Sequence, residues 1–398
     1  MTSSRFIAKL WIPTTLLGLL LLGSLAYINH TPEVNYDGSY ANSVTVALQS
    51  LAGKGPIADL AQDIVGFRTL IAGQSAYPML APAYRSMLGL HWNVRTNSTH
   101  PPSAFLLLFP VAFLAWSAAL QAWSILTLGF VLLSLILLRL RWPFLIGGFL
   151  LMLIWPPVVL SLGQITAIWL LGFCIAYRFK DRAPFWSGIG AALAAATKLT
   201  PALLILPAVY RKSRAALLGF LLFVLLVLLI LLALNPGVLR EYVSANLHHS
   251  IFVLHRYDNG SLLAVMYSIL GPTGVALSLL FLGLVLLACI PRLKADDDLM
   301  WMLAGYLSVA ALPIAWCFSL LPLAPIMIYF VRSRQIGSML AAGLVYVLPF
   351  IAPMGSELAA RITAATIALI GLGFMPLTLA HNQEVVPAAE RAESLPIG

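Results

Sequence analysis

Charged side chains are scarce in this chain. Only 9% of its 398 residues are Asp, Glu, Lys or Arg, against about 25% in ordinary soluble domains. Apolar residues make up 61% of the sequence, where soluble domains have about 45–50%. A soluble fold cannot cover so much apolar surface with so few charges, so most of the chain is expected to lie in lipid. This composition excludes a soluble enzyme and a disordered protein for the body of the chain.

Cysteine is scarce as well. Cys174, Cys289 and Cys317 each lie inside an apolar run, where a thiol behaves as a small hydrophobic group. They indicate neither a disulfide framework nor a cysteine metal site.

Acidic residues are outnumbered, 14 against 23 Lys and Arg, which gives a formal net charge of +9. The basic residues form short clusters between apolar runs, as is typical of cytoplasmic loops. The charge excess therefore indicates membrane topology, and we expect no nucleic-acid partner. The clusters are Arg139/Arg141, Arg178–Arg182, Arg211–Arg214, Arg292/Lys294 and Arg332/Arg334.

Arg5 and Lys9 precede an apolar run over residues 10–28. Although residues 24–26 resemble a signal-peptidase site, the run is longer than the ~7–15 apolar residues of a secretory signal. We therefore predict a retained first helix that begins in the cytoplasm and ends outside.

Residues 29–101 form the longest polar stretch, predicted to be a large first extracytoplasmic loop. Connections between helices usually have about 2–8 residues, and much longer loops are usually functional. Within the loop, Ile57–Ala72 places Leu60, Ile64 and Phe67 at helical spacing, which predicts an amphipathic helix along the membrane surface. Gly73 is expected to end it.

The remaining apolar runs predict an all-α, polytopic membrane protein with about 10 to 13 transmembrane helices, at ~20 residues for each crossing. We expect a single domain over residues 1–380, a second outer loop at 235–261 and a cytoplasmic tail at 381–398. Residues 142–177 are predicted to form a hairpin with its outer turn at 155–157. Ala183–Tyr210 is predicted to form two short helices with a break near Pro201.

Further spans are expected at 119–138, 217–234, 274–290, 300–315, 318–330, 338–350 and 358–379. Ser103–Ala118 looks helical too. Because the charge markers allow one net crossing here, this segment is either a half-span or a place where the markers fail.

Asp63 is the leading catalytic candidate. Apolar neighbours would seat its carboxylate at the boundary of water and lipid, where partial burial raises its basicity. It would then accept the proton of an attacking hydroxyl. The alternative is a solvated residue or a packing partner of Arg68.

Lys198 lies in a segment that otherwise lacks charge. A cation on a broken helix is suited to binding a phosphate, while snorkelling to the interface is the equal alternative. His100, before Pro101-Pro102, is either a residue at the rim of a site or part of a structural turn.

Other polar residues are weaker candidates. Gln164 interrupts an apolar run, where an amide usually makes an interhelical hydrogen bond. His248 and His249 lack a third ligand at metal-site spacing, so contacts with anions or hydroxyls are favoured. Tyr77 and Asn259 complete the set predicted on the outer face.

Taken in order, these pieces resemble the GT-C membrane glycosyltransferases, and most closely glycosyltransferase family 87, the polyprenol-phosphate-mannose-dependent mannosyltransferases. The similar motifs are Asp63 followed by Ala72-Gly73-Gln74-Ser75-Ala76-Tyr77, then His100-Pro101-Pro102, Gly163-Gln164, Lys198-Leu199-Thr200-Pro201 and Asn259-Gly260-Ser261. The family's late Ser-Pro-x-Ser-Trp-x-His-His pattern is only partly present: residues 312–318 keep Trp316 and lack the histidines.

The resemblance implies a multi-pass plasma (inner) membrane enzyme of glycolipid or cell-envelope synthesis, with its site on the extracytoplasmic face. It would transfer a mannose-like hexose, with inversion, from a polyprenyl-phosphate donor to a hydroxyl of a glycolipid or glycan. Asp63 would be the general base. Arg68, Tyr77, His100, Gln164, Lys198, His248, His249 and Asn259 would bind substrate. No metal and no cofactor are expected, because a monophosphate donor has no diphosphate for a metal to bridge.

Two rival functions fit a helical membrane protein. A transporter or glycolipid flippase would also contain a broken helix, but no inverted repeat is visible. A polysaccharide polymerase or ligase usually has its large loop late in the chain, whereas here it comes early. The early loop favours the transferase.

Overall fold

The computed structural model describes residues 33–34, 40–41, 49–54, 58–91, 98–138, 163–257, 259–294, 296–315, 317–332 and 357–375. The predicted first helix at 10–28, the hairpin turn at 155–157, the span at 338–350 and the tail at 381–398 lie outside these residues.

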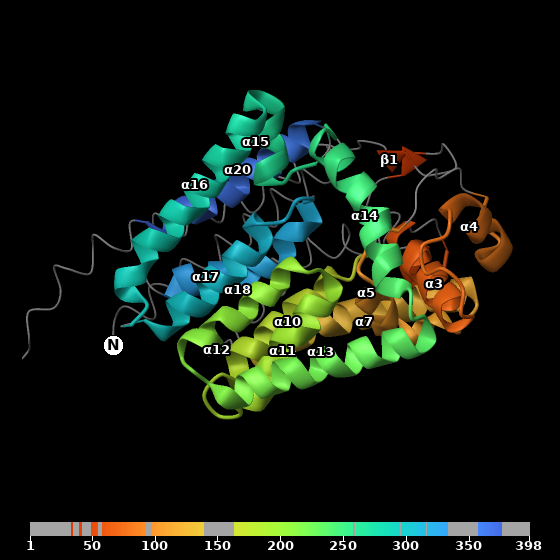
Figure 1. Cartoon of the computed structure of the whole chain (residues 1–398), viewed down its shortest axis with the longest axis horizontal. Helices are drawn as coiled ribbons and strands as arrows, with labels where there is room; N and C mark the ends of the chain where they lie inside the picture. Colours follow the sequence, from red (N-terminus) through yellow and green to blue (C-terminus); the bar gives the residue numbers. More distant parts are fainter. Residues whose placement is uncertain are drawn as a thin grey trace, which may run out of the picture.

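Apart from one pair of two-residue strands, the regular elements of the described chain are helical (Figure 1). Strand β1 (Glu33–Val34) pairs antiparallel with β2 (Tyr40–Ala41). The first half contains α3 (Ala58–Ile71), α4 (Leu80–Leu88), α5 (Pro102–Leu107), α6 (Phe109–Ala112), α7 (Trp116–Leu137), α10 (Thr166–Phe179), α11 (Pro184–Thr197), η1 (Thr200–Ile205) and α12 (Leu206–Tyr210). The second half contains α13 (Arg214–Leu234), α14 (Val238–Leu254), α15 (Leu262–Leu270), α16 (Pro272–Cys289), η2 (Ile290–Arg292), α17 (Asp297–Ala310), η3 (Cys317–Leu323), α18 (Ala324–Arg332) and α20 (Glu357–Phe374).

Four described helices are long and apolar enough to cross a membrane: α7, α13, α16 extended to Arg292, and α20. A helix of ~20 residues spans the ~30 Å hydrocarbon core. The most apolar 18-residue window of α13 has a mean hydropathy of 3.4, and only 11% of that window is buried, as expected for a helix that faces lipid. The prediction of a helical membrane protein is confirmed, while the number of 10 to 13 spans stays a prediction.

The segment Ser103–Ala118 folds as the short helices α5 and α6 rather than as a full span. Pro110 falls at the first turn of α6, where a proline ring interrupts the preceding helix. The following helix, α7, is long and apolar enough to make the one crossing that the charge markers allow. A full span by this segment alone is therefore not seen, and the half-span stays a prediction.

The break predicted near Pro201 is confirmed. Helix α11 ends at Thr197, and Lys198 has an extended backbone, with φ −153° and ψ 155°. The chain resumes as the 3-10 helix η1, with Pro201 in its first turn. Lys198 therefore occupies the gap between two helices.

Helix α3 matches the predicted bounds closely, and Gly73, with φ 67°, follows its end. However, it is not a surface helix with one wet face. Leu60, Ile64 and Phe67 pack in one core cluster, while Ala61 and Val65 pack in a second cluster with α4. Helix α4 therefore covers a second face of α3. The segment 235–261, predicted as a second outer loop, contains the 17-residue helix α14.

We predict that Gly66→Ala destabilises the protein by about 1–3 kcal/mol, the usual cost of overpacking. A Cβ atom on Gly66 would lie 2.8 Å from ring atoms of Phe105 on α5. Thermal unfolding in detergent measures the effect. Gly129→Ala on α7 is the control, because its Cβ would meet no atom within 4 Å; equal melting temperatures for the two variants would contradict the tight α3–α5 packing.

Candidate active site

Two carboxylates lie four residues apart on α3 and therefore share one helix face. Asp63 has an exposed fraction of 0%, whereas Asp59 is only half-buried. A buried carboxylate needs hydrogen-bond partners or nearby positive charge to be tolerated. The chain supplies both from three other segments.

His100 is the partner of Asp63. Its Nδ1 lies 2.8 Å from Oδ1 and 3.0 Å from Oδ2 of the carboxylate. Pro101 and Pro102 start α5 directly after it and fix the direction in which the chain enters the helix. On the other side, the Tyr77 hydroxyl donates to the His100 carbonyl over 2.9 Å. The histidine is thus held from both its ring and its backbone.

Gln164 is the partner of Asp59. Its Nε2 donates to Oδ2 of that carboxylate, and Gln62 donates to Oδ1 over 3.1 Å. The preceding residue, Gly163, has φ 65°, and its carbonyl accepts a 3.1 Å hydrogen bond from the Trp123 indole. This turn brings the amide from the start of α10 to the α3 face.

Lys198 completes the cluster from the α11–η1 break. The Ser103 hydroxyl donates to the carbonyl of Ala196 over 2.9 Å and so fastens the end of α11 to the start of α5. From this position the ammonium group attracts the carboxylates of Asp59 and Asp63. An acid group from the first loop and a basic group from the broken hairpin therefore converge on one site.

Burial dominates the electrostatics of the carboxylates. It raises the pKa of Asp59 to about 6, against the opposing attraction of His100 and Lys198. It also raises the pKa of Asp63, although His100 favours the ionised form. For His100, burial lowers the pKa, but the Asp63 carboxylate outweighs this effect and the net shift is upward. The cluster therefore retains protons that separate groups in water would lose.

Two predicted residues make well-defined contacts elsewhere. The Arg68 guanidinium donates to the carbonyls of Ala112, Met87 and Leu114 over 2.7–2.9 Å, which joins α3 to α4 and to the turn before α7. Asn259 donates to the Pro313 carbonyl and accepts from the backbone of Ser261 and Ala315. Both side chains therefore hold backbone segments together in the fold. Substrate binding by them stays a prediction.

Tyr77 is 5% exposed and reaches the cluster through its hydroxyl group. His248 and His249 lie on α14, but their side chains are outside the described part of the chain. Asp59 is the member that sequence reasoning missed. Its i,i+4 spacing to Asp63 was the signal that could have found it.

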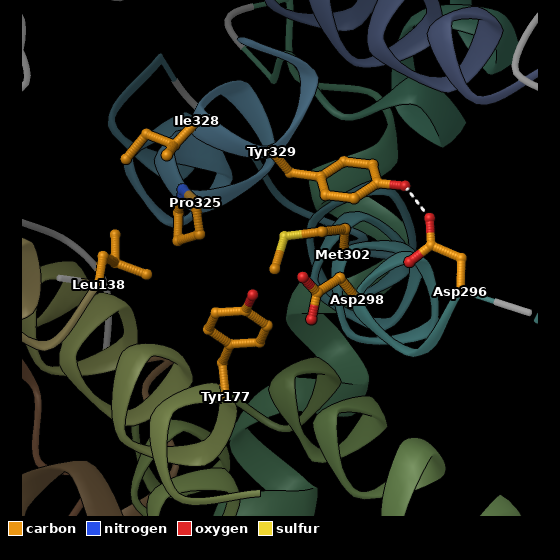
Figure 2. Close-up of a pocket in the computed structure, with 8 residues that line it drawn as sticks. All are labelled: Leu138, Tyr177, Asp296, Asp298, Met302, Pro325, Ile328 and Tyr329. Atoms are coloured by element: carbon orange, nitrogen blue, oxygen red, sulfur yellow. Dashed lines mark hydrogen bonds between the residues drawn. The ribbon is translucent and has the colours of Figure 1, made fainter. Parts of the chain in front are cut away.

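A separate cavity of about 240 Å³ lies at the other end of α10, next to Leu138, Tyr177 and Tyr329 (Figure 2). Its carboxylates already have partners. Asp296 accepts from the Tyr329 hydroxyl over 2.5 Å, and Asp298 accepts from Lys180 over 2.5 Å. We place the candidate site at α3, because two carboxylates, a histidine and a lysine from separate segments converge there.

The membrane helices and this polar cluster together indicate an enzyme embedded in a membrane. The chain matches glycosyltransferase family 87 over residues 99–319, which is more than half of its length, and it therefore belongs to that family. The resemblance seen in its motifs is confirmed, and the protein is a membrane glycosyltransferase. The matched region contains His100, Gln164 and Lys198, while α3 lies before it. No curated protein and no solved structure matches the chain.

We predict that the cluster loses stability as pH rises through the range between the ordinary Asp pKa of 3.8 and the value of about 6 for Asp59. In that range the folded state binds more protons than the unfolded state, so the free energy of unfolding falls with rising pH. Asp59→Asn removes this term and should gain stability relative to wild type as pH rises from 4 to 6.5. The measurement is the melting temperature of wild type and of Asp59→Asn across that pH range. Parallel curves for the two proteins would contradict the raised pKa of Asp59.

Proposed function

We propose that the protein is an inverting glycosyltransferase that moves a mannose-like hexose from a polyprenyl-phosphate donor to a hydroxyl group of a glycolipid or glycan. The observation that carries the proposal is the convergence of the buried Asp63 and the half-buried Asp59 with Lys198 at one site. A carboxylate can take the acceptor's proton, while a cation can stabilise a leaving phosphate.

The reaction needs a general base. The acceptor oxygen attacks the anomeric carbon and loses its proton to a carboxylate. Asp63 has no exposed surface, and both of its oxygens face His100. Asp59 is half-buried, and burial raises its pKa to about 6, close to the range in which a base works at neutral pH. We therefore propose that Asp59 takes the proton, with the Asp63–His100 pair behind it.

The bond between the anomeric carbon and the phosphate oxygen breaks as the new glycosidic bond forms. The electron pair of the broken bond leaves with the phosphate oxygen, where negative charge develops. A fixed positive charge that faces such a group lowers the barrier. We propose Lys198 for this role, with His100 as its neighbour and His248 and His249 as further candidates on α14. Because a monophosphate has no diphosphate to bridge, the proposed reaction requires no metal.

The site is proposed to face the extracytoplasmic side of the plasma (inner) membrane. The basic clusters of the α10–α11 and α12–α13 connections support a cytoplasmic position for the other end of the bundle, by the positive-inside rule. A polyprenyl chain would remain in lipid while its sugar-phosphate head reaches the α3 face. Membership of a glycosyltransferase family favours this function over a transporter or flippase.

We predict that Asp59→Asn lowers kcat by ~10²–10⁴-fold, the usual contribution of a general base. Asp63→Asn should cost less, because an amide oxygen still accepts from His100. Transfer from radiolabelled polyprenyl-phosphate mannose to total membrane glycolipid measures both variants. Asp181→Asn, a carboxylate at the other end of the bundle, is the control. A larger loss of kcat in Asp63→Asn than in Asp59→Asn would identify Asp63 as the base. Full activity in both variants would refute the proposed mechanism.

We predict that Lys198→Ala impairs use of the lipid donor more than use of the acceptor, with a fall in kcat/KM for the donor of about 10²-fold, as for the loss of one charge-stabilising group. Lys198→Arg keeps a cation and should restore part of the activity. Lys54→Ala, an exposed lysine, is the control. Unchanged donor dependence in Lys198→Ala would contradict the phosphate role.

A further inference from the structure

Helix α14 makes a set of polar contacts with the first loop that the proposed mechanism does not use. It follows α13 and packs against α5 and α15 (Figure 1). Glu241, in its first turn, lies opposite the turn that joins α3 to α4. The contact joins two segments more than 160 residues apart in the chain.

The two oxygens of Glu241 have separate partners. Oε2 accepts from the Ser75 hydroxyl and from the Ala76 backbone N–H, both over 3.0 Å. Oε1 accepts from Asn235 Nδ2 over 3.0 Å, and that amide also donates to the Gln74 carbonyl over 3.3 Å. Hydrogen bonds to an ionised carboxylate are stronger than neutral ones. Glu241 thus binds the 74–76 turn at three points, directly or through Asn235.

The next residue along the turn leads into the candidate site. The Tyr77 N–H donates to Ser75 Oγ over 3.3 Å, and the Tyr77 ring packs on Tyr242 with centroids 5.9 Å apart. The Tyr77 hydroxyl in turn holds the His100 carbonyl, and the His100 ring faces Asp63. A continuous series of contacts therefore runs from α14 to the buried carboxylate.

We propose that Glu241 is a positioning residue for glycosyl transfer: it clamps the 74–76 turn to α14 and so fixes Tyr77 and His100 against Asp63. This inference rests on the proposed function of the α3 cluster. It gives the second outer segment a mechanical role in the reaction besides any contact with substrate. A small displacement of His100 would misalign the charges around the reacting atoms, and misplacement by about 1 Å costs about 10²-fold in rate.

The test compares single and double variants of the full-length protein in nanodiscs. Glu241→Ala should lower kcat by about 10–10²-fold, while KM for polyprenyl-phosphate mannose changes less than twofold and the melting temperature stays close to wild type. Ser75→Ala should lower kcat in the same direction. The double variant should be no slower than Glu241→Ala alone, since coupled residues are not additive. Arg240→Gln, exposed on the same helix, is the matched control.

Glu241→Gln serves as the conservative variant, because its one remaining oxygen still faces Ser75 and Ala76. It should restore most of the rate lost in Glu241→Ala and supplies a readout even if the alanine variant fails to fold. Full kcat in Glu241→Ala, losses that add in the double variant, or no rescue by Gln would each overturn the clamp. If Glu241→Ala is fully active while Asp59→Asn is inactive, only the clamp fails; if both Asp59→Asn and Asp63→Asn are fully active, the proposed function fails.

Discussion

The buried pair of Asp63 and His100 is the interaction on which the rest of the site depends. Removing a carboxylate from water costs several kcal/mol unless a partner repays it. The partner must come from the start of α5, so α5 has to lie directly against α3. Gly66 permits that approach, because a side chain there would collide with Phe105. The close packing of α3 on α5 therefore also brings His100 to Asp63 and so assembles the acid–base cluster.

The sequence predicted those parts of the fold that depend on long apolar runs and on proline. The spans at α7, α13 and α16 follow from hydropathy, and the break around Lys198 follows from Pro201. The burial of α3 could not be predicted in the same way. Its second packed face consists of Val65 beside the small Ala61, so it carries a weaker hydrophobic signal than the face with Leu60, Ile64 and Phe67. Helix α14 was missed as a helix because its charged and polar residues resemble those of a loop.

The candidate site was predictable in composition and only partly in arrangement. His100, Gln164 and Lys198 stand out as polar groups in apolar surroundings, and the structure brings each of them to α3. Asp59 was missed because a single carboxylate already satisfied the expected chemistry. Arg68 and Asn259 show the opposite problem. Sequence identifies a side chain with several donors or acceptors, but whether these meet a ligand or backbone groups depends on the path of distant segments.

The order in which the site's components are synthesised has a consequence for assembly of the protein. Chains emerge from the ribosome at about 5–20 residues per second, and α3 precedes Lys198 and Glu241 by well over a hundred residues. During that interval of several seconds or more the two carboxylates of α3 lack most of their final neighbours. Hydration must therefore sustain these carboxylates until the later helices are in place, which makes closure of the first loop a late step in biogenesis.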